Sequence, residues 1–196
     1  MSIMIDLIGS AIIAGYVMII GLTVNSNISA TAVSSVTSVN VQESIMEATK
    51  QIESDFRKMG YRVADPTTVI SIADSNRLKF QGDITRNGSV DIVEWYTGTA
   101  VTKANGLQVR NLYRKVNSGT ATIVASNVLT FKLRYLDQDG LPTNLLTNIA
   151  MIETALELTS PYRVQDQIAP SANSQEYITT MWLYGRLSAR NMNRHG

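Results

Sequence analysis

An almost uncharged apolar segment occupies the first 24 residues of the chain, and Asp6 is its only charged side chain. From Leu7 to Val24 there is no Lys, Arg, Asp or Glu. As a helix, this run extends roughly 27 Å, which is close to the thickness of the hydrocarbon core of a bilayer. It lacks the basic start and the small-residue cleavage site of a signal peptide. We therefore expect it to be retained, as a membrane anchor or as the core of an assembly.

An amphipathic segment follows and ends at Gly60. Apolar residues recur there at three- and four-residue steps, and polar or charged residues occupy most remaining positions. Gly60 is a typical residue for the end of a helix, because it accepts left-handed backbone angles. The sequence predicts one mostly continuous helix over residues 3–59, with Asn25–Ser35 as the stretch whose weak helix formers would allow loosening. The side chains expected to face a sheet are Ile45, Ile52, Phe56 and Met59.

After Pro66 the pattern changes to short alternating runs bounded by Asn, Asp and Gly, which is typical of antiparallel strands. The expected strands are Thr68–Ile72, Arg77–Ile84, Ser89–Thr97, Gly106–Val116, Ala121–Leu136, Asn148–Thr159 and Glu176–Ser188. The expected turns are Asp74–Asn76, Asn87–Gly88, Asn117–Gly119 and Asp139–Gly140. The segment Gln165–Gln175 is expected to be a mobile loop.

These patterns predict an α+β fold, in which a long N-terminal α-helix packs on a C-terminal antiparallel β-sheet domain. Residues 1–40 are expected to form an apolar helix that serves as membrane anchor or filament core. Residues 41–60 form the amphipathic half of the helix, and residues 61–196 form a β-rich globular domain.

Composition argues against catalysis and against nucleic-acid binding. The formal net charge is +1, so a concentrated basic face is not expected. The chain has no cysteine, and its single histidine, His195, lies next to the C-terminus. No Ser/His/Asp, metal-ligand or phosphate-loop pattern can be assembled. We therefore expect no enzymatic activity, no cofactor and no metal site.

Two patterns in the β-region have both a functional and a plain interpretation. Asp137–Gly140 resembles the start of a calcium loop, but it lacks the later ligands and the terminal Glu, so a turn is the preferred interpretation. Four aromatic residues could form a sugar-binding face, but packing in the core and on the sheet is expected. These residues are Trp95, Tyr96, Tyr113 and Tyr135.

The order of these elements resembles the type IV pilin-like superfamily, and within it the large minor pilins and minor pseudopilins of type IV pili and type II secretion systems. The segments that carry the likeness are Gln51–Tyr61, Arg77–Ile84 with Asn87–Gly88, Val128–Asp137 with Asp139–Gly140, and Leu187–Asn191. The resemblance implies a helical filament in which the N-terminal helices bundle and the β-domains cover the exterior.

The resemblance implies a role for Asp6. In that family a carboxylate, usually Glu, at the fifth residue of the mature chain pairs with the N-terminal amine of a neighbouring subunit. Removal of Met1, which Ser2 would permit, makes Asp6 the fifth residue. A buried carboxylate needs a cation, and an α-amino group is one. Since no basic leader precedes the run, a mature form or a relative inserted without a leader is expected. The plain alternative is an interfacial acid at the end of an ordinary anchor.

Further residues of the same helix are candidates for subunit contact: Gly9, Ala11, Gly15 and Tyr16. Ala11 and Gly15 have the four-residue spacing that permits close approach of two helices. Small residues are also common in membrane helices without such a role. Packing and coincidence therefore remain equal alternatives for this pair.

The function implied by the resemblance is that of a structural subunit in a type IV pilus-like or pseudopilus-like filament. Its expected partners are further copies of itself and other pilin-like subunits. The expected location is the cell surface, with an inner-membrane-anchored form before assembly. The alternatives are a low-copy minor pilin or pseudopilin that primes or tips a filament, and a single-pass anchored binding protein with an exposed β-domain.

Overall fold

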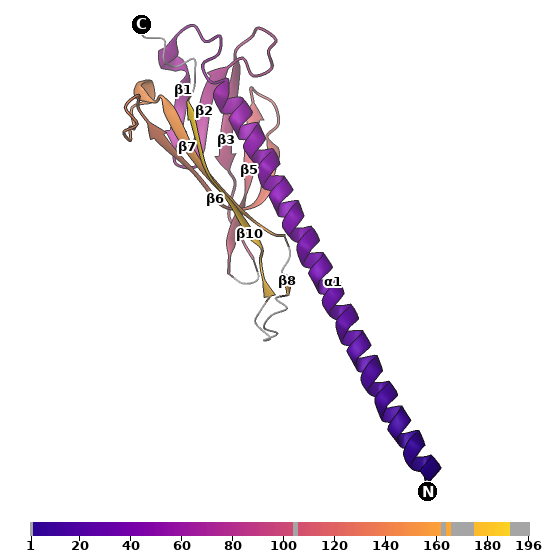
Figure 1. Cartoon of the computed structure of the whole chain (residues 1–196). Coiled ribbons are helices and arrows are strands. Elements are labelled where there is room, and N and C mark those ends of the chain that lie inside the picture. The colour runs from indigo at the N-terminus through magenta and orange to yellow at the C-terminus, as the bar shows by residue number, and fades with distance from the viewer. Residues whose placement is uncertain (1, 104–105, 162–163, 166–174, 189–196) are drawn as a thin grey trace. The chain divides into compact units, whose positions relative to one another are not determined.

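The computed structural model describes residues 2–103, 106–161, 164–165 and 175–188. Within these ranges a long helix, α1 (Ser2–Arg57), precedes an antiparallel sheet that is curled (Figure 1). This confirms the predicted α+β fold. The chain divides into two compact units, Met1–Val39 with Tyr162–Ile178 and Asn40–Pro161 with Thr179–Gly196.

Helix α1 is continuous through Asn25–Ser35, where loosening was expected. The hydroxyls of Ser29 and Thr31 each donate a 2.9 Å hydrogen bond to the backbone carbonyl oxygen four residues earlier. These bonds satisfy the hydroxyls within the helix. The helix ends at Arg57, two residues before the predicted end, and Gly60 has the expected left-handed conformation, with φ of 74°.

Seven strands of the main sheet correspond to the predicted ones, with the order β1-β2-β3-β5-β6-β7-β10, and a short β4 pairs with β5. The strands are β1 (Ile70–Asp74), β2 (Arg77–Gly82), β3 (Asp91–Thr97), β4 (Val101–Thr102), β5 (Gln108–Val116), β6 (Thr122–Leu136), β7 (Met151–Thr159) and β10 (Thr179–Ser188). One 3₁₀ turn, η1 (Pro66–Thr68), precedes β1, and a second, η2 (Leu146–Asn148), lies between β6 and β7. In a separate pair, β8 (Val164–Gln165) and β9 (Gln175–Glu176) join the ends of the predicted mobile segment, whose residues 166–174 lie outside the described ranges.

The curl of the sheet brings the β1–β2 hairpin to the long strand β6. The first part of β6 pairs with β5 and its second part pairs with β7. Beside that second part, Leu133 N donates to Ser75 O at 2.7 Å, and the Tyr135 hydroxyl donates to Asp74 O at 2.7 Å. Burial and the nearby Asp74 carboxylate raise the pKa of Tyr135, so its hydroxyl stays protonated and remains a donor.

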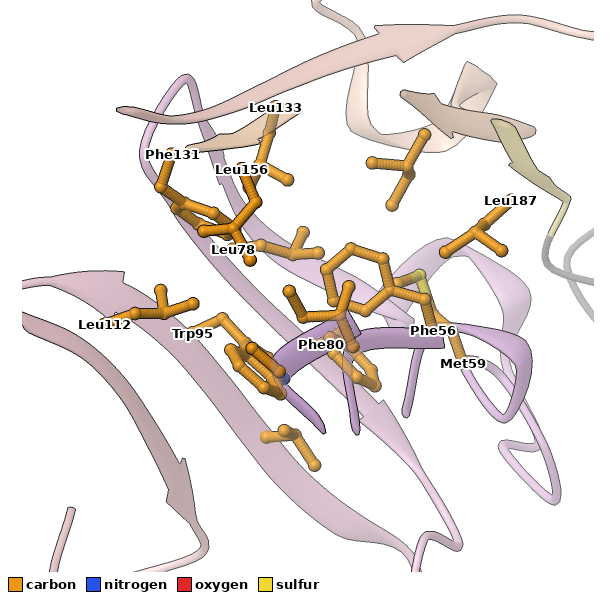
Figure 2. Close-up of a cluster of buried hydrophobic side chains, with 14 of the residues drawn as sticks. Phe56, Met59, Leu78, Phe80, Trp95, Leu112, Phe131, Leu133, Leu156 and Leu187 are labelled. Atoms are coloured by element: carbon orange, nitrogen blue, oxygen red, sulfur yellow. The ribbon is translucent and has the colours of Figure 1, made fainter. Parts of the chain in front are cut away.

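The core lies between the second half of α1 and the sheet. It contains all four side chains that were expected to face the sheet. From α1 these core residues are Val41, Ile45, Ala48, Ile52 and Phe56, and Met59 follows two residues after the end of the helix. The ring of Phe56 meets Phe80 and Trp95 edge to face, with centroid distances of 5.9 and 6.3 Å (Figure 2). Trp95 and Tyr135 are buried, whereas Tyr96 stacks on Tyr113 with half-buried rings. The four aromatic residues therefore pack in the core and on the sheet.

The turn residues behave largely as expected. Gly88, Gly140 and Asn117 have positive φ angles. In the Asp137–Gly140 turn, the Asp137 carboxylate accepts hydrogen bonds from the backbone N–H groups of Asp139 and Leu141, at 3.0 and 2.9 Å. This carboxylate holds the turn itself, which supports the turn interpretation over a calcium loop.

The end of α1 is joined to β2 through the backbone. Gly60 N donates to Gln81 O at 2.9 Å, and Asp83 N donates to Tyr61 O at 3.0 Å. At Gly82 the approach is so close that a Cβ atom would collide with the carbonyl oxygen of Lys58. Only glycine fits at this position without movement of the backbone.

Candidate functional site

The first part of α1 exposes large apolar side chains along its length, unlike the second part. Ile3 is 81% exposed and Val39 is 59% exposed, whereas Ile52 is fully buried. The apolar surface is nearly continuous as far as Val24, and after it Ile28, Val33, Val36 and Val39 are exposed among Ser, Thr and Asn. Monomeric soluble proteins rarely expose so many large apolar side chains on one element. The exposed half of α1, residues 3–39, is therefore the candidate functional site of this chain, as a surface for contact with lipid or with other protein.

This surface is longer than a bilayer requires. An 18-residue stretch of the helix is apolar enough to cross a membrane, a property that signal sequences share. Residues 3–39 extend roughly 54 Å as a helix, against about 30 Å of hydrocarbon core. Beyond the apolar run, Ile28 and Val36 are still 63% and 59% exposed. A bilayer covers only part of this surface at any one time.

The predicted contact residues fall on two faces of this helix. By helical periodicity, Ser2, Asp6, Gly9 and Tyr16 share one face, and Ala11 and Gly15 lie on the opposite face. Asp6, Ala11, Gly15 and Tyr16 are exposed and Gly9 is partly exposed. The six residues thus form two candidate contact faces instead of one. The structure does not describe the side chain of Ser2.

Asp6 has no cationic side chain near it along its own helix. The first basic residue after it is Lys50, roughly 66 Å away along the helix axis. A carboxylate that enters apolar surroundings without a cation costs several kcal/mol or becomes protonated. If this face of the helix is covered, the cation that pairs with Asp6 cannot be a side chain of the same helix. It has to come from an α-amino group or from another molecule.

Two of the three polar side chains within the apolar run, those of Ser10 and Thr23, are satisfied within the helix. The Ser10 hydroxyl donates to Leu7 O and the Thr23 hydroxyl donates to Ile19 O, both at 2.9 Å. Since neither hydroxyl needs water, these polar residues do not prevent the surface from being covered by lipid or by another helix.

A buried ion pair sets the rotation of the second half of α1 against the sheet. The carboxylate of Asp55 accepts hydrogen bonds from Nε and Nη2 of Arg114 at 2.6 and 3.0 Å, and from Nε1 of Trp95 at 3.1 Å. Asp55 is fully buried. As a charged residue, Asp55 was expected on the polar side of the helix. Its spacing of three residues from Ile52 and seven from Ala48, both buried, is the signal that places it beside the core.

A second buried carboxylate, Asp91, holds the segment after β2. It accepts hydrogen bonds from the backbone N–H groups of Ile84 and Thr85, both at 3.2 Å, and from Nδ2 of Asn117 at 2.8 Å. Burial alone would raise the pKa of Asp91, but the hydrogen bonds from Asn117, Thr85 and Ile84 outweigh it and hold the pKa below its ordinary value.

This lowered pKa predicts a pH dependence of stability. Asp91 contributes stability above the unfolded-state pKa of about 3.9, and the contribution is lost as the pH falls through the lower folded-state pKa. Asp91→Asn should therefore be less stable than the parent at pH 7, and the difference should narrow in acid. Urea denaturation of both proteins from pH 7 down to about pH 3 measures this. A difference that stays constant over this range would contradict the assignment.

No protein-family model matches the chain, and a search of curated proteins finds no significant match. Within the described ranges, no group of three or more His, Cys, Asp or Glu side chains is placed to hold a metal ion. The architecture itself, one long, apolar N-terminal helix packed on an antiparallel sheet, is compatible with a pilin-like fold.

Proposed function

We propose that this protein is a structural subunit of a helical filament of the type IV pilus-like or pseudopilus-like kind, assembled through the exposed half of α1. The observation that carries the proposal is that α1 still exposes Ile28, Val33, Val36 and Val39 beyond the apolar run that a bilayer covers. Helices from other copies would cover the remainder. The second half of α1 supplies the helix side of the core of the β-domain, so this domain needs no other copy to complete its core. In the filament it would lie on the exterior.

Before assembly, the same helix would anchor the chain in the inner membrane. Assembly would then exchange lipid contacts for helix contacts. Because lipid tails are as apolar as the helix, this exchange depends on close packing and on polar pairs more than on burial of apolar area. Ala11 and Gly15 offer close packing on one face, and Asp6 offers a polar pair on the other.

A truncated chain that begins at Asn40 tests the proposal. It keeps Val41 and the rest of the core, so we expect it to be soluble, folded and monomeric. The full-length protein, sheared from cells or extracted with detergent, should form filaments visible by negative-stain electron microscopy. Filaments of the truncated chain would show that the exposed half of α1 is not the assembly element. A full-length protein found only at the ends of filaments of another protein would indicate the low-copy role.

A second test concerns the carboxylate. If Asp6 pairs with a cation of a neighbouring copy, Asp6→Ala leaves that cation unpaired, and a loss of about 1.4 kcal/mol per contact already lowers affinity tenfold. We expect filament yield to fall more than about tenfold, with the β-domain folded and membrane insertion intact. Asp6→Glu should be tolerated. Normal assembly of Asp6→Ala at parental yield would make Asp6 an ordinary interfacial acid.

A further inference from the structure

The loop between β2 and β3 presents an Asn-Gly-Ser sequence, Asn87-Gly88-Ser89, at the surface. Residues 85–90 are all exposed. Asn-X-Ser/Thr, with X other than proline, is the acceptor sequence for attachment of a glycan to the asparagine side chain. The three-residue sequence alone is a weak signal, because short motifs of this kind also arise by chance. The exposure and conformation of the loop are therefore the stronger argument.

The geometry of this loop is set by a buried carboxylate. Asp83, which is 1% exposed, accepts hydrogen bonds from the backbone N–H groups of Asn87 and Gly88, at 3.1 and 3.0 Å. Gly88 has φ of 91°, an angle that suits glycine. The loop is therefore held as a preformed, projecting turn while its side chains face solvent.

Within this turn the Asn87 side chain is oriented by its own loop. Its Oδ1 accepts a 2.8 Å hydrogen bond from Ser89 N, which closes a turn over the three acceptor residues. In the described part of the chain, no hydrogen-bond partner is recorded for Nδ2 of Asn87. Asn87 Nδ2, the atom that would bond to the glycan, therefore lies at the surface without a described hydrogen-bond partner. It is close in sequence to Ser89, which the acceptor sequence requires.

A second Asn-X-Ser sequence in the same chain provides an internal comparison. Asn27-Ile28-Ser29 lies inside α1, where residues two apart point to different sides of the helix. The Ser29 hydroxyl there donates to Asn25 O at 2.9 Å, back into the preceding turn. The same three-residue pattern is therefore held in a conformation that separates its asparagine from its serine.

We propose that Asn87 is an N-glycosylation site and that Asn27 is not. The reaction requires a polyprenyl-phosphate-linked glycan as donor. The Asn87 Nδ2 bonds to the anomeric carbon, the bond from that carbon to the phosphate oxygen breaks, the polyprenyl phosphate leaves with the electron pair, and the Nδ2 proton passes to a base of the transferring enzyme. The inference rests on the proposed function insofar as a membrane-anchored, exported domain meets such lipid-linked donors.

Site-resolved mass spectrometry of the full-length protein, isolated from the cells that make it, tests this. We expect a glycan mass on the peptide that contains Asn87, its complete loss in Asn87→Gln and in Ser89→Ala, and its retention in Ser89→Thr. Ser89→Ala is the sharper variant, because the turn uses the backbone N of Ser89 and survives. The Asn27 peptide should carry no glycan.

An unmodified Asn87 in the parent, a glycan that persists in Ser89→Ala, or a glycan on Asn27 would overturn the inference. Electron microscopy of the same preparations keeps the two proposals separate. Filaments with an unmodified Asn87 contradict only the glycosylation site, whereas a glycan on Asn87 without filaments contradicts only the assembly role.

Discussion

Replacement of Phe56 by alanine is expected to lower the free energy of unfolding of the β-domain by about 3–5 kcal/mol. The ring is 1% exposed and packs edge to face on Phe80 and Trp95, so its removal leaves a cavity where α1 meets the sheet. Urea denaturation of the chain that begins at Asn40 measures this loss without interference from the apolar run.

The exposed Ser54 serves as control, because Ser54→Ala two residues away should change stability by no more than about 0.5 kcal/mol. A loss below about 1 kcal/mol for Phe56→Ala would mean that this face of α1 is not the packed one in solution.

Replacement of Arg114 by methionine is expected to cost about 3–5 kcal/mol, because it leaves the buried carboxylate of Asp55 without its cation. Methionine keeps an apolar stem similar to that of arginine. The loss of stability therefore reflects the missing positive charge more than lost packing of the side chain. Adding Asp55→Asn should recover more than half of the loss, since the amide oxygen still accepts from Trp95 Nε1 and carries no charge.

A surface ion pair of the same sheet provides the matched control. Arg134 lies 3.4 Å from Glu153 and its side chain is 63% exposed, so Arg134→Met should cost no more than about 1 kcal/mol. Equal losses for the two arginine variants, measured by urea denaturation, would contradict the role given to the Asp55–Arg114 pair.

The division of α1 into two parts could be read from residue types alone. An uncharged apolar run predicts a surface that avoids water, and apolar residues at helical spacing predict a face that packs on a partner element. Gly60 marked the end of the helix because few other residues accept its backbone angle. The seven main strands were predicted for a similar reason: alternation and turn residues are local properties of the chain.

Of the candidate site, the sequence indicated the exposed half of α1 and the isolation of Asp6 from any cation on its helix. The two faces, Asp6 with Gly9 and Ala11 with Gly15, follow from helical periodicity and therefore from the predicted helix itself. The continuity of α1 adds that no break or turn separates these faces from the rest of the exposed half.

The contacts between distant segments were decided only by the tertiary structure. In the sequence, Asp55 cannot be distinguished by its residue type from the exposed acids of the helix. Only the fold places Trp95 of β3 and Arg114 of β5 against its carboxylate. The division of β6 between β5 and β7 likewise depends on strand register and on the curl of the sheet. The sequence by itself determined which surfaces avoid water, since hydrophobicity is a property of each residue. The partners of the buried charges were decided by the fold, because a charge is stabilised only by the groups that the rest of the chain places around it.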